Sequence, residues 1–314
     1  MNAPSQPEPC VLLTGMGGVL GAGLARGRKT GESLRVVIAG RFRPPAWSEA
    51  EFMEADFREP GSMRALVEQL QPQAVLHAAA IARIDRCETE PELAHRLHVG
   101  AVEEGMAALA ASGGRWITVS TDQVFDGQAD RYAEDAEPSP IHAYGRSKAE
   151  GEAATLRAGG VVVRLPLLLG PAVPGRPERM GADQVLVAAA RRGDAWQLFE
   201  DEWRAPADAV DLAAPLFALL DAARSPQAQG VYHLAGAEAV NRYTLGELAC
   251  ALADAPFPHQ RARLADWSGP PRPPKLVLSC ERVRRELGYP APDLRQSLAR
   301  SAADALAQAR GQET

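Results

Sequence analysis

Short apolar runs alternate with longer segments of helical periodicity through the first half of the chain. Five of these runs have the length and composition of buried strands: Val11–Thr14, Leu34–Ala39, Ala74–Ala79, Trp116–Ser120 and Val161–Leu165. Helices are predicted in the sequence between them, at Ser62–Gln71, Pro91–Ala111 and Tyr144–Arg157. Apolar strands separated by helices are typical of a parallel sheet that is covered on both faces. The pattern therefore predicts an α/β fold with a doubly wound parallel sheet, the Rossmann type.

The pattern changes after Gly170, where a loop begins that is rich in glycine and proline and contains Pro171, Pro174 and Pro177. One more strand is predicted at Val231–Ala235, and helices are predicted at Ala182–Arg192, Asp208–Ala223, Tyr243–Ala253, Cys280–Leu287 and Leu294–Ala307. Residues 1–170, with about 207–236, are expected to form a dinucleotide-binding domain. About 171–206 and 237–314 are expected to form a smaller, mostly helical substrate-binding lobe. This lobe should cover the carboxyl ends of the strands, where open α/β sheets bind their ligands.

Composition and charge narrow the classes of function. The 314 residues carry a net charge of −6, which argues against nucleic acid as the main partner. The cysteines show no Cys-x-x-Cys spacing, so reduced thiols in a cytoplasmic protein are expected; they are Cys10, Cys87, Cys250 and Cys280. Met1–Cys10 lacks the features of a signal peptide, and no apolar run approaches the ~20 residues of a membrane span. No membrane association is therefore expected.

A glycine-rich turn follows the first predicted strand. Gly15, Gly18 and Gly21 are spaced three apart, with Gly17 as an extra glycine, and Val19 and Leu20 begin the next helix. Such glycines allow a tight turn, a close approach of the main chain to a pyrophosphate, and close packing of helix on strand. The free N–H groups of the helix then face the phosphates. The motif predicts a dinucleotide site, although an ordinary strand-to-helix turn has the same glycines.

The residues after the second strand bear on the choice of cofactor. An NAD enzyme usually has Asp or Glu there to bind the ribose hydroxyls, but this chain has Gly40-Arg-Phe-Arg43. Arg41 suits a 2′-phosphate, which favours NADP(H) and leaves NAD(H) open. The alternative is that Arg41 and Arg43 are solvated loop residues in an arginine-rich chain. Asp56 and Phe57, after the next short stretch, are predicted to contact the adenine.

Tyr144 and Lys148 form a Tyr-x-x-x-Lys pair at the start of a predicted helix. The chain has five tyrosines and only three lysines, so chance predicts about 0.05 pairs with this spacing. Residues four apart share a helix face, so the phenol and the ammonium can converge. We expect the ammonium to lower the pKa of the phenol from its ordinary ~10, so that Tyr144 can give a proton to a carbonyl oxygen. The alternative is an incidental pair on a surface helix.

Two further polar groups end the strand before this helix. Thr121 could hydrogen-bond the same carbonyl oxygen, and Asp122 could contact a sugar hydroxyl. The alternative for both is a plain strand end with a Ser/Thr turn. His95 and His98 are three apart, as metal ligands can be, but no third ligand is apparent. No metal site is therefore predicted, and both histidines are expected on a partly exposed helix face.

Several segments together resemble the extended short-chain dehydrogenases/reductases, and most closely their dTDP-4-dehydrorhamnose reductase branch. The resemblance covers nearly the whole chain. It is carried by Thr14–Gly21, His77–Ala80, Ile84–Ala94, Ser120–Gly127, the Tyr144/Lys148 pair and Asp201–Ala213. The Ser120–Gly127 segment is similar to the S-T-D-Y-V-F-x-G motif of that branch, and Asp201–Ala213 to its D-Q-x-x-x-P-T-x-x-x-D-L-A segment.

The resemblance implies an NAD(P)H-dependent reductase of a 4-keto sugar nucleotide. In such an enzyme Tyr144 donates the proton, Lys148 holds the ribose, and Thr121 orients the carbonyl. Ala78, Ala79 and Ala80 would lie beside the nicotinamide, and a homodimer remains open. The departures lie where the substrate would bind: Gln123 replaces a tyrosine, Leu167 stands where an aromatic residue would line the sugar pocket, and His98 stands where many relatives have a structural asparagine.

Two alternatives stay open beside the reductase. One is a nucleotide-sugar epimerase or dehydratase on the same fold, because dehydratases place an acid beside the threonine and Asp122 is such an acid. The other is a non-catalytic, NADP-binding regulatory subunit of a partner enzyme, since this branch includes one. The intact Tyr144/Lys148 pair argues against the subunit.

Overall fold

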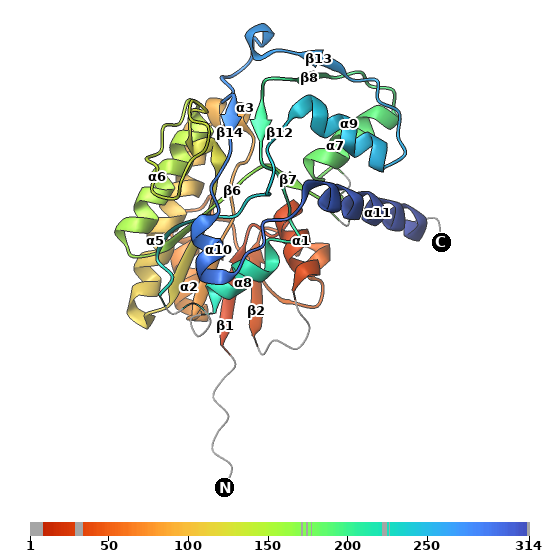
Figure 1. The fold of residues 1–314 in the computed structure, drawn as a ribbon. Helices are drawn as coiled ribbons and strands as arrows, with labels where there is room; N and C mark the ends of the chain where they lie inside the picture. Colours follow the sequence, from red (N-terminus) through yellow and green to blue (C-terminus); the bar gives the residue numbers. More distant parts are fainter. Residues whose placement is uncertain are drawn as a thin grey trace.

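A seven-stranded parallel sheet forms the centre of the protein (Figure 1). The computed structural model describes residues 9–28, 34–170, 172–173, 175–176, 178–221, 225 and 227–312. The strands of the sheet are β1 (Cys10–Thr14), β2 (Arg35–Gly40), β3 (Glu51–Glu54), β4 (Ala74–His77), β5 (Arg115–Thr121), β6 (Val161–Leu165) and β11 (Gly230–His233). The predicted doubly wound α/β fold is confirmed, and β3 is a strand that the sequence pattern did not single out.

The strand order is β11-β6-β5-β4-β1-β2-β3, and every neighbouring pair is parallel. The order reverses between β1 and β4, which pair with Thr14 opposite His77. The loops that leave these two strands therefore diverge to opposite faces of the sheet and open a crevice between them. That crevice lies at the carboxyl ends, where the glycine turn and the segment Ala78–Ala80 begin.

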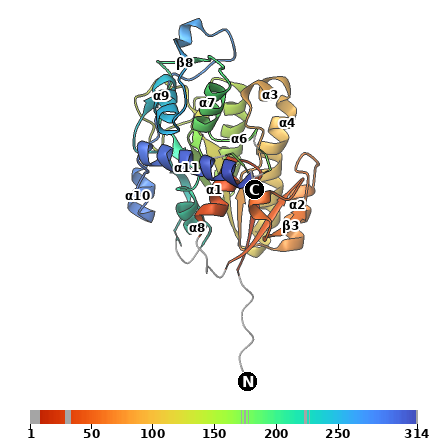
Figure 2. The same ribbon diagram turned by 90° about the vertical axis from the view of Figure 1, so that its right-hand side faces the viewer.

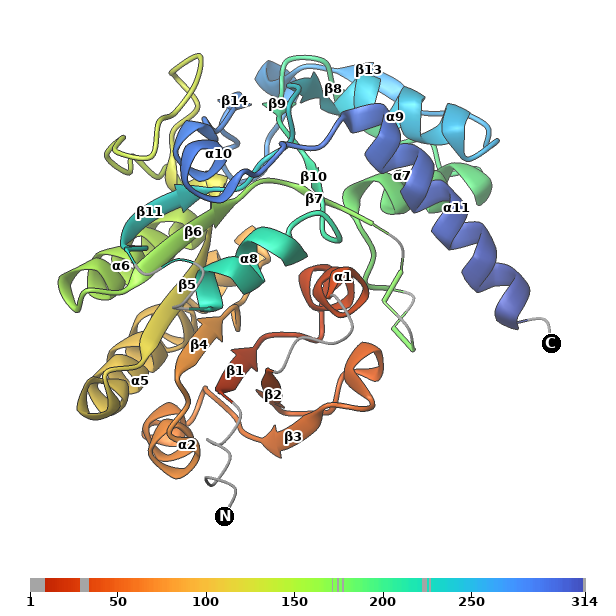
Figure 3. The ribbon, with the colours of Figure 1, turned by 60° about the horizontal axis from the view of Figure 1, so that its bottom comes forward.

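Helices cover both faces of the sheet, as Figure 3 shows. One face carries α1 (Val19–Gly27) and α8 (Ala213–Leu220), and the other carries α2 (Ser62–Leu70), α5 (Ala101–Leu109) and α6 (Ala143–Arg157). Two short helices, α3 (Ile84–Thr89) and α4 (Pro91–His95), lead into α5. The predicted helix at Asp208–Ala223 begins later than expected, because Asp208 belongs to the short strand β10 (Ala207–Asp208) and residues 222–223 lie outside the described chain.

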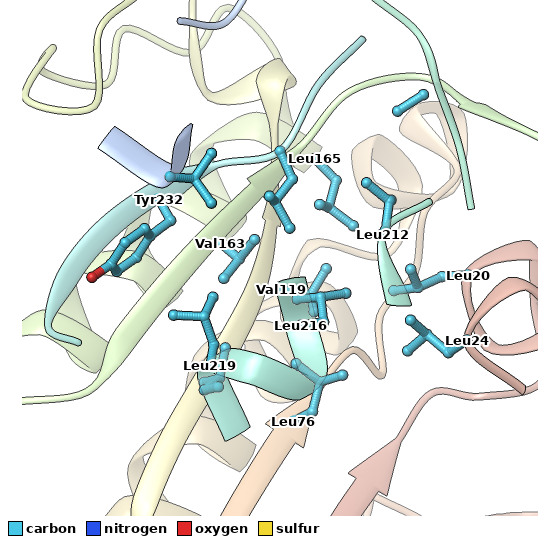
Figure 4. Packing of buried hydrophobic residues seen from close by; sticks show 14 of the residues in the cluster. Leu20, Leu24, Leu76, Val119, Val163, Leu165, Leu212, Leu216, Leu219 and Tyr232 are labelled. Atoms are coloured by element: carbon cyan, nitrogen blue, oxygen red, sulfur yellow. The ribbon is translucent and has the colours of Figure 1, made fainter. Parts of the chain in front are cut away.

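The main core lies under α8. Leu212, Leu216 and Leu219 pack over Val119 and Val163 of the sheet (Figure 4). All of these side chains are buried, and α8 is apolar around most of its circumference because it is covered on several sides. Burial of each such side chain contributes about 1.5–3 kcal/mol, so this layer holds the central strands and their carboxyl ends in place.

A second lobe stands beside the carboxyl ends of the sheet (Figures 1 and 2). Its helices are α7 (Ala182–Arg191), α9 (Arg242–Leu252) and α11 (Leu294–Gln312), which enclose a separate apolar core that includes Leu186, Leu245 and Leu298. Short strands complete it: β7 (Leu168–Leu169), β8 (Gln197–Phe199), β9 (Trp203–Arg204), β12 (Val240–Asn241), β13 (Gln260–Ala262) and β14 (Lys275–Leu276). Helix α10 (Glu281–Leu287) packs near β11 instead. A connecting loop was predicted at Pro171, Pro174 and Pro177, and these three residues lie outside the described part of the chain.

Helix α11 crosses from this lobe to the nucleotide side of the molecule. Asp304 forms an ion pair of 2.6 Å with Arg26 of α1. Arg300 pairs with the carboxylates of Asp208 and Asp211, at 2.8 and 2.5 Å. The helix is therefore anchored at several points along its length. Within the part of the chain that the structure covers, no helix has the length and apolar content needed to cross a bilayer.

Candidate active site

The glycine turn has the geometry that a bound pyrophosphate requires. Gly15 has φ +77°, and a Cβ there would lie 2.3 Å from the carbonyl carbon of Ala78. A Cβ at Gly21 would lie 2.0 Å from the carbonyl oxygen of Met16, so both positions need glycine. Gly18 caps the N-terminus of α1, and no heavy atom lies within 4 Å of its Cβ position. Open space therefore faces the free N–H groups of the helix, as a phosphate site needs.

The other residues predicted to bind the cofactor around this turn differ in how far they are buried. Val19 is half-buried at the start of α1, whereas Leu20 points into the main core. Ala78 and Ala79 pass directly beneath Gly15, and Ala80 is exposed beyond them. The structure thus brings the glycine turn and the alanine segment together at the point where the strand order reverses.

The three residues predicted to contact the adenosine part of the cofactor differ in exposure and in their partners. Arg41 is exposed, and among the described residues it has no hydrogen bond or ion pair. Asp56 is bound by Arg58, whose hydrogen bonds lower the pKa of the carboxyl. The ring of Phe57 is buried in the core beside His77, with ring centroids 6.2 Å apart. Its side chain therefore faces away from solvent, and only its main chain is left for the predicted adenine contact.

The predicted catalytic residues lie together above the end of β5. Thr121 ends this strand, and Asp122 begins a single 3₁₀ turn at Asp122–Val124. Tyr144 and Lys148 stand one turn apart on α6, which packs against β5. The Thr121 hydroxyl is close enough to Tyr144 to lower the pKa of its phenol. All four groups are thus within one small region at the carboxyl edge of the sheet.

The expected lowering of the Tyr144 pKa by Lys148 is not found. Burial raises the pKa of Tyr144 above its ordinary value, Thr121 opposes this rise, and Asp122 adds to it. The Lys148 Nζ atom instead donates a hydrogen bond of 2.7 Å to the carbonyl oxygen of Val119. Burial also lowers the pKa of Lys148 to about 8. Desolvation therefore dominates the pKa of the phenol, Lys148 is not among the groups that shift it, and the phenol holds its proton at neutral pH.

Asp122 has one committed and one unpartnered oxygen. Its side chain is 2% exposed, and Oδ1 accepts a hydrogen bond of 3.3 Å from the Thr121 hydroxyl. The other oxygen, Oδ2, is buried and has no hydrogen-bond partner among the described residues. Burial raises the pKa of Asp122 to about 6 against the opposing charge of Arg204. An orphaned buried oxygen beside the catalytic groups is well placed to accept a hydroxyl of a bound ligand.

Gln123 and His142 hold the N-terminus of α6. The sequence analysis did not predict this contact between them. His142 caps α6: its Nδ1 accepts a hydrogen bond of 3.0 Å from the main-chain N–H of Gly145. Its Nε2 lies 3.0 Å from the Oε1 of Gln123, the residue that replaces the usual tyrosine. The His142 ring is also stacked 6.1 Å from that of Tyr144. Gln123 is therefore linked through His142 to the N-terminus of α6.

His98 has a structural role, and its predicted partial exposure is wrong. The predicted helix Pro91–Ala111 contains a π-helical turn at Arg96–Gly100 that turns His98 inward to 1% exposure. Its Nε2 accepts from the main-chain N–H of Ile81 at 3.1 Å, and its Nδ1 lies 2.8 Å from the Ser147 hydroxyl. It thus ties the alanine segment to the catalytic helix. His95 is exposed, and the described residues contain no group of three metal-binding side chains.

A cluster of arginines adjoins Asp122 on the side of the second lobe. Glu202 is buried and binds Arg204 at 2.8 Å and Arg272 at 2.9 Å. Arg242 is half-buried, interacts electrostatically with Glu202, Arg204 and Asp122, and has no ion pair among the described residues. Burial would raise the pKa of Glu202, but these three arginines hold it below its ordinary value.

Cations therefore outnumber carboxylates in this cluster, which suits an anionic ligand. No local sequence pattern indicates this cluster, because its arginines come from β9, α9 and the loop before β14. Leu167, predicted to line the sugar pocket, is half-buried and packs against the core of the second lobe.

The fold and the Tyr144/Lys148 helix define an extended short-chain dehydrogenase/reductase type of protein. Residues 10–307 match the family model described as the RmlD substrate binding domain, and the chain belongs to this family. A solved dTDP-4-dehydrorhamnose reductase from Bacillus anthracis, in complex with NADP, has a similar fold, with a TM-score of 0.80 and 19% identity. The alignment covers 95% of this chain and 99% of that structure.

Two curated relatives differ in their names. Methionine adenosyltransferase 2 subunit beta of Xenopus tropicalis is 31% identical over 294 residues, covering 89% of this chain and 83% of the relative. A probable low-salt glycan biosynthesis reductase of Haloferax volcanii is 29% identical over 293 residues, covering 91% of this chain and 95% of the relative. One relative is thus named as a subunit and the other as a reductase, and both are similar along most of their length.

Proposed function

We propose that this protein is an NADP(H)-dependent reductase that acts on the ketone of a 4-keto sugar nucleotide. The observation that carries the proposal is the convergence of Thr121, Asp122, Tyr144 and Lys148 beside the glycine turn. The glycine turn fits a dinucleotide. A Cβ at Gly15 or Gly21 would clash with the main chain, whereas the space beside Gly18, where a phosphate would lie, is open. The Haloferax relative is named a reductase, and the Bacillus structure is named as an NADP complex.

The chemistry follows from the state of each group. The glycine turn and the Ala78–Ala80 segment would hold a nicotinamide cofactor, which would supply the hydride for the carbonyl carbon of the substrate. Tyr144 remains protonated at neutral pH and donates its proton to the carbonyl oxygen, while the Thr121 hydroxyl orients that oxygen. Lys148 is held by Val119 through one of its three N–H groups, which leaves the ammonium facing the ribose that the family resemblance assigns to it. The free oxygen of Asp122, Oδ2, accepts a hydrogen bond from a sugar hydroxyl.

The division into domains fits this assignment. Residues 1–170 and about 207–236 hold the cofactor, and the remainder closes over the substrate. The surplus cations around Glu202 bind the diphosphate of the sugar nucleotide, beyond Asp122. The cytoplasmic location and the homodimer stay predictions.

Loss of the proton donor tests the proposal. Tyr144→Phe should lower the rate of NADPH oxidation with a dTDP-4-keto-6-deoxyhexose at least about 100-fold, because Thr121 can hydrogen-bond the carbonyl oxygen but only Tyr144 is proposed to transfer a proton to it. Turnover is followed at 340 nm, and NADPH affinity by fluorescence titration should stay unchanged. Tyr243→Phe, in the second lobe, is the control and should retain full activity. Full activity of Tyr144→Phe, or no turnover by the unmodified protein with any keto-sugar nucleotide, would contradict the proposal.

Two specific observations keep other functions in competition. The identity with a protein named as a subunit favours a non-catalytic, NADP-binding regulatory subunit, which would bind cofactor and a partner enzyme without turnover. The acid Asp122 beside Thr121 favours an epimerase or dehydratase, which would retain its nicotinamide through purification and convert substrate without net oxidation of NADPH. Stoichiometric NADPH oxidation in the assay above separates the reductase from both.

A further inference from the structure

The segment between β7 and α7 folds back onto the glycine turn. It leaves and returns at one point, because the main-chain N–H of Gly181 donates a hydrogen bond of 2.9 Å to Gly170. Within it, Val173 is buried and exchanges main-chain hydrogen bonds with Arg176 and Arg179, at 2.8 and 2.7 Å. We call the described residues of this excursion, 172–173, 175–176 and 178–180, the return loop; its two arginines, Arg176 and Arg179, face the nucleotide domain.

Arg179 of the return loop is bonded to the glycine turn itself. Its Nη1 donates a hydrogen bond of 2.9 Å to the carbonyl oxygen of Gly17. The ring of Phe42 closes the other side, since a Cβ at Gly17 would lie 2.9 Å from its Cζ. The guanidinium of Arg176 stacks 4.3 Å from the centroid of this ring, and that of Arg179 lies 5.9 Å from it. Gly17 is therefore enclosed by a phenyl ring and a guanidinium.

The neighbouring charges are not equally available. Arg43 donates to the carbonyl oxygens of Ser48 and Ala50, so it is committed to the loop after β2. Arg176 lies 3.8 Å from Glu178, which offsets part of its charge. Arg179 has no carboxylate partner among the described residues, and its one hydrogen bond, to Gly17, leaves further N–H groups to donate. Arg41, next to Phe42 in the chain, is close enough to Asp56 to lower the pKa of that carboxyl, but it forms no ion pair or hydrogen bond among the described residues.

We propose that Arg179 and Arg41 together form the site for the 2′-phosphate of NADP(H), with Arg176 positioning Phe42 between them. This inference rests on the proposed function, since it assigns residues to its cofactor. The Gly17 side of the turn faces the end of β2, where dinucleotide folds place the adenosine ribose. The pyrophosphate is taken by the open space at Gly18 instead. A forked guanidinium matches a phosphate, and NAD(H) carries no group at this position.

Removal of the Arg179 fork tests the assignment by binding alone. Arg179→Gln should weaken NADP⁺ and adenosine 2′,5′-bisphosphate by roughly 10- to 100-fold, the usual loss for a charge-assisted pair. NAD⁺ and AMP, which lack the 2′-phosphate, should bind within about twofold of their original affinities. Affinities are measured by calorimetric titration of the whole chain. Arg192→Gln removes an exposed arginine of the same lobe and is the matched control.

The outcomes are distinct. Selective loss of NADP⁺ and the bisphosphate, with partial recovery in Arg179→Lys, supports the assignment. Equal weakening of NADP⁺ and NAD⁺ overturns it, because Arg179 would then act only by packing the return loop. No change in either affinity also overturns it. If Arg179→Gln does not fold, Arg41→Gln at the exposed position gives the same selective comparison. Failure of the unmodified protein to bind either dinucleotide would instead overturn the proposed function.

Discussion

Two buried arginine–glutamate pairs differ in how their charge is balanced. One joins α6 to β6: Glu152 of α6 and Arg164 of β6 are each 2% exposed and 2.7 Å apart. Glu152 also accepts from the Ser120 hydroxyl, and the Arg164 guanidinium lies 4.8 Å from the centroid of the Phe125 ring. This pair is closed, since one cation meets one carboxylate and aromatic and polar groups fill the remaining contacts.

The second pair, Arg204 and Glu202 near Asp122, is open, because its cations outnumber its carboxylate. Arg204 and Glu202 are almost as buried, at 4% and 3%, and are 2.8 Å apart. Glu202 is shared with Arg272, and Arg242 adds a third cation without a partner of its own in the described chain. A buried surplus of charge is costly unless a ligand completes it. The difference fits a structural role for the first pair and the anion-binding role that we propose for the second.

The largest effect is expected in the closed pair. Glu152→Gln leaves the Arg164 cation buried without its counter-charge, and should lower the free energy of unfolding by about 3–5 kcal/mol. Urea denaturation followed by circular dichroism measures it. The double change Glu152→Leu with Arg164→Met removes both charges and should cost less than the single one. A loss as small as that of an exposed pair would mean that the pair does not serve the fold.

A smaller effect, on binding rather than stability, is expected in the open cluster. Arg242→Gln should weaken binding of dTDP about 10-fold, because one uncommitted cation is lost from the anion site. The midpoint of urea denaturation should not fall, because the change removes a surplus cation from the ligand-free cluster. Arg261→Gln, an exposed arginine of the same lobe, is the control for calorimetric titration. If Arg242→Gln lowers the stability but leaves the affinity for dTDP intact, the open cluster has a structural role like that of the closed pair.

The smallest effect concerns pH and has the opposite sign to that of Glu152→Gln. Because burial raises the pKa of Asp122 to about 6, the folded protein binds more protons here than the unfolded chain between the ordinary value and that pKa. The associated stability is full at low pH and is lost as the pH rises through about 6. Asp122→Asn should therefore raise the free energy of unfolding at pH 8 by on the order of 1 kcal/mol.

Urea denaturation of the Asp122→Asn variant and the unmodified protein across pH 4–8 measures this difference. The two stabilities should converge toward low pH, where Asp122 is already neutral. A variant that is less stable at pH 8 would show that Asp122 is held as a favourable anion by the arginines.

Local spacing accounts for what could be predicted from the sequence. The glycines of the turn are close together in the chain, and so are Tyr144 and Lys148, so strand and helix geometry alone positions the members of each motif. The apolar runs predicted the central strands to within one or two residues because each is buried on both faces. Only β3 was passed over, since its Glu51–Glu54 sequence is too polar to resemble a buried strand.

Burial and long-range convergence account for what could not be predicted. The spacing of Tyr144 and Lys148 indicates that they share a helix face, but not that desolvation would dominate the pKa of the phenol. Arg204, Arg242 and Arg272 are separated by tens of residues, and 31 of the 34 basic residues are arginines. No local pattern distinguishes these three from the exposed ones. The return loop was likewise assigned to the substrate lobe, whereas its Arg179 contacts the cofactor turn.

The anchoring of helix α11 determines how the cleft can move. Its ion pairs with Arg26 of α1 and with Asp208 and Asp211 join the second lobe to the nucleotide side of the molecule. Gln308 adds a hydrogen bond of 3.2 Å to the carbonyl oxygen of Ala172, at the start of the return loop. A wide hinge opening would break all of these contacts together. We therefore expect ligands to enter by local displacement of loops, and not by separation of the two lobes.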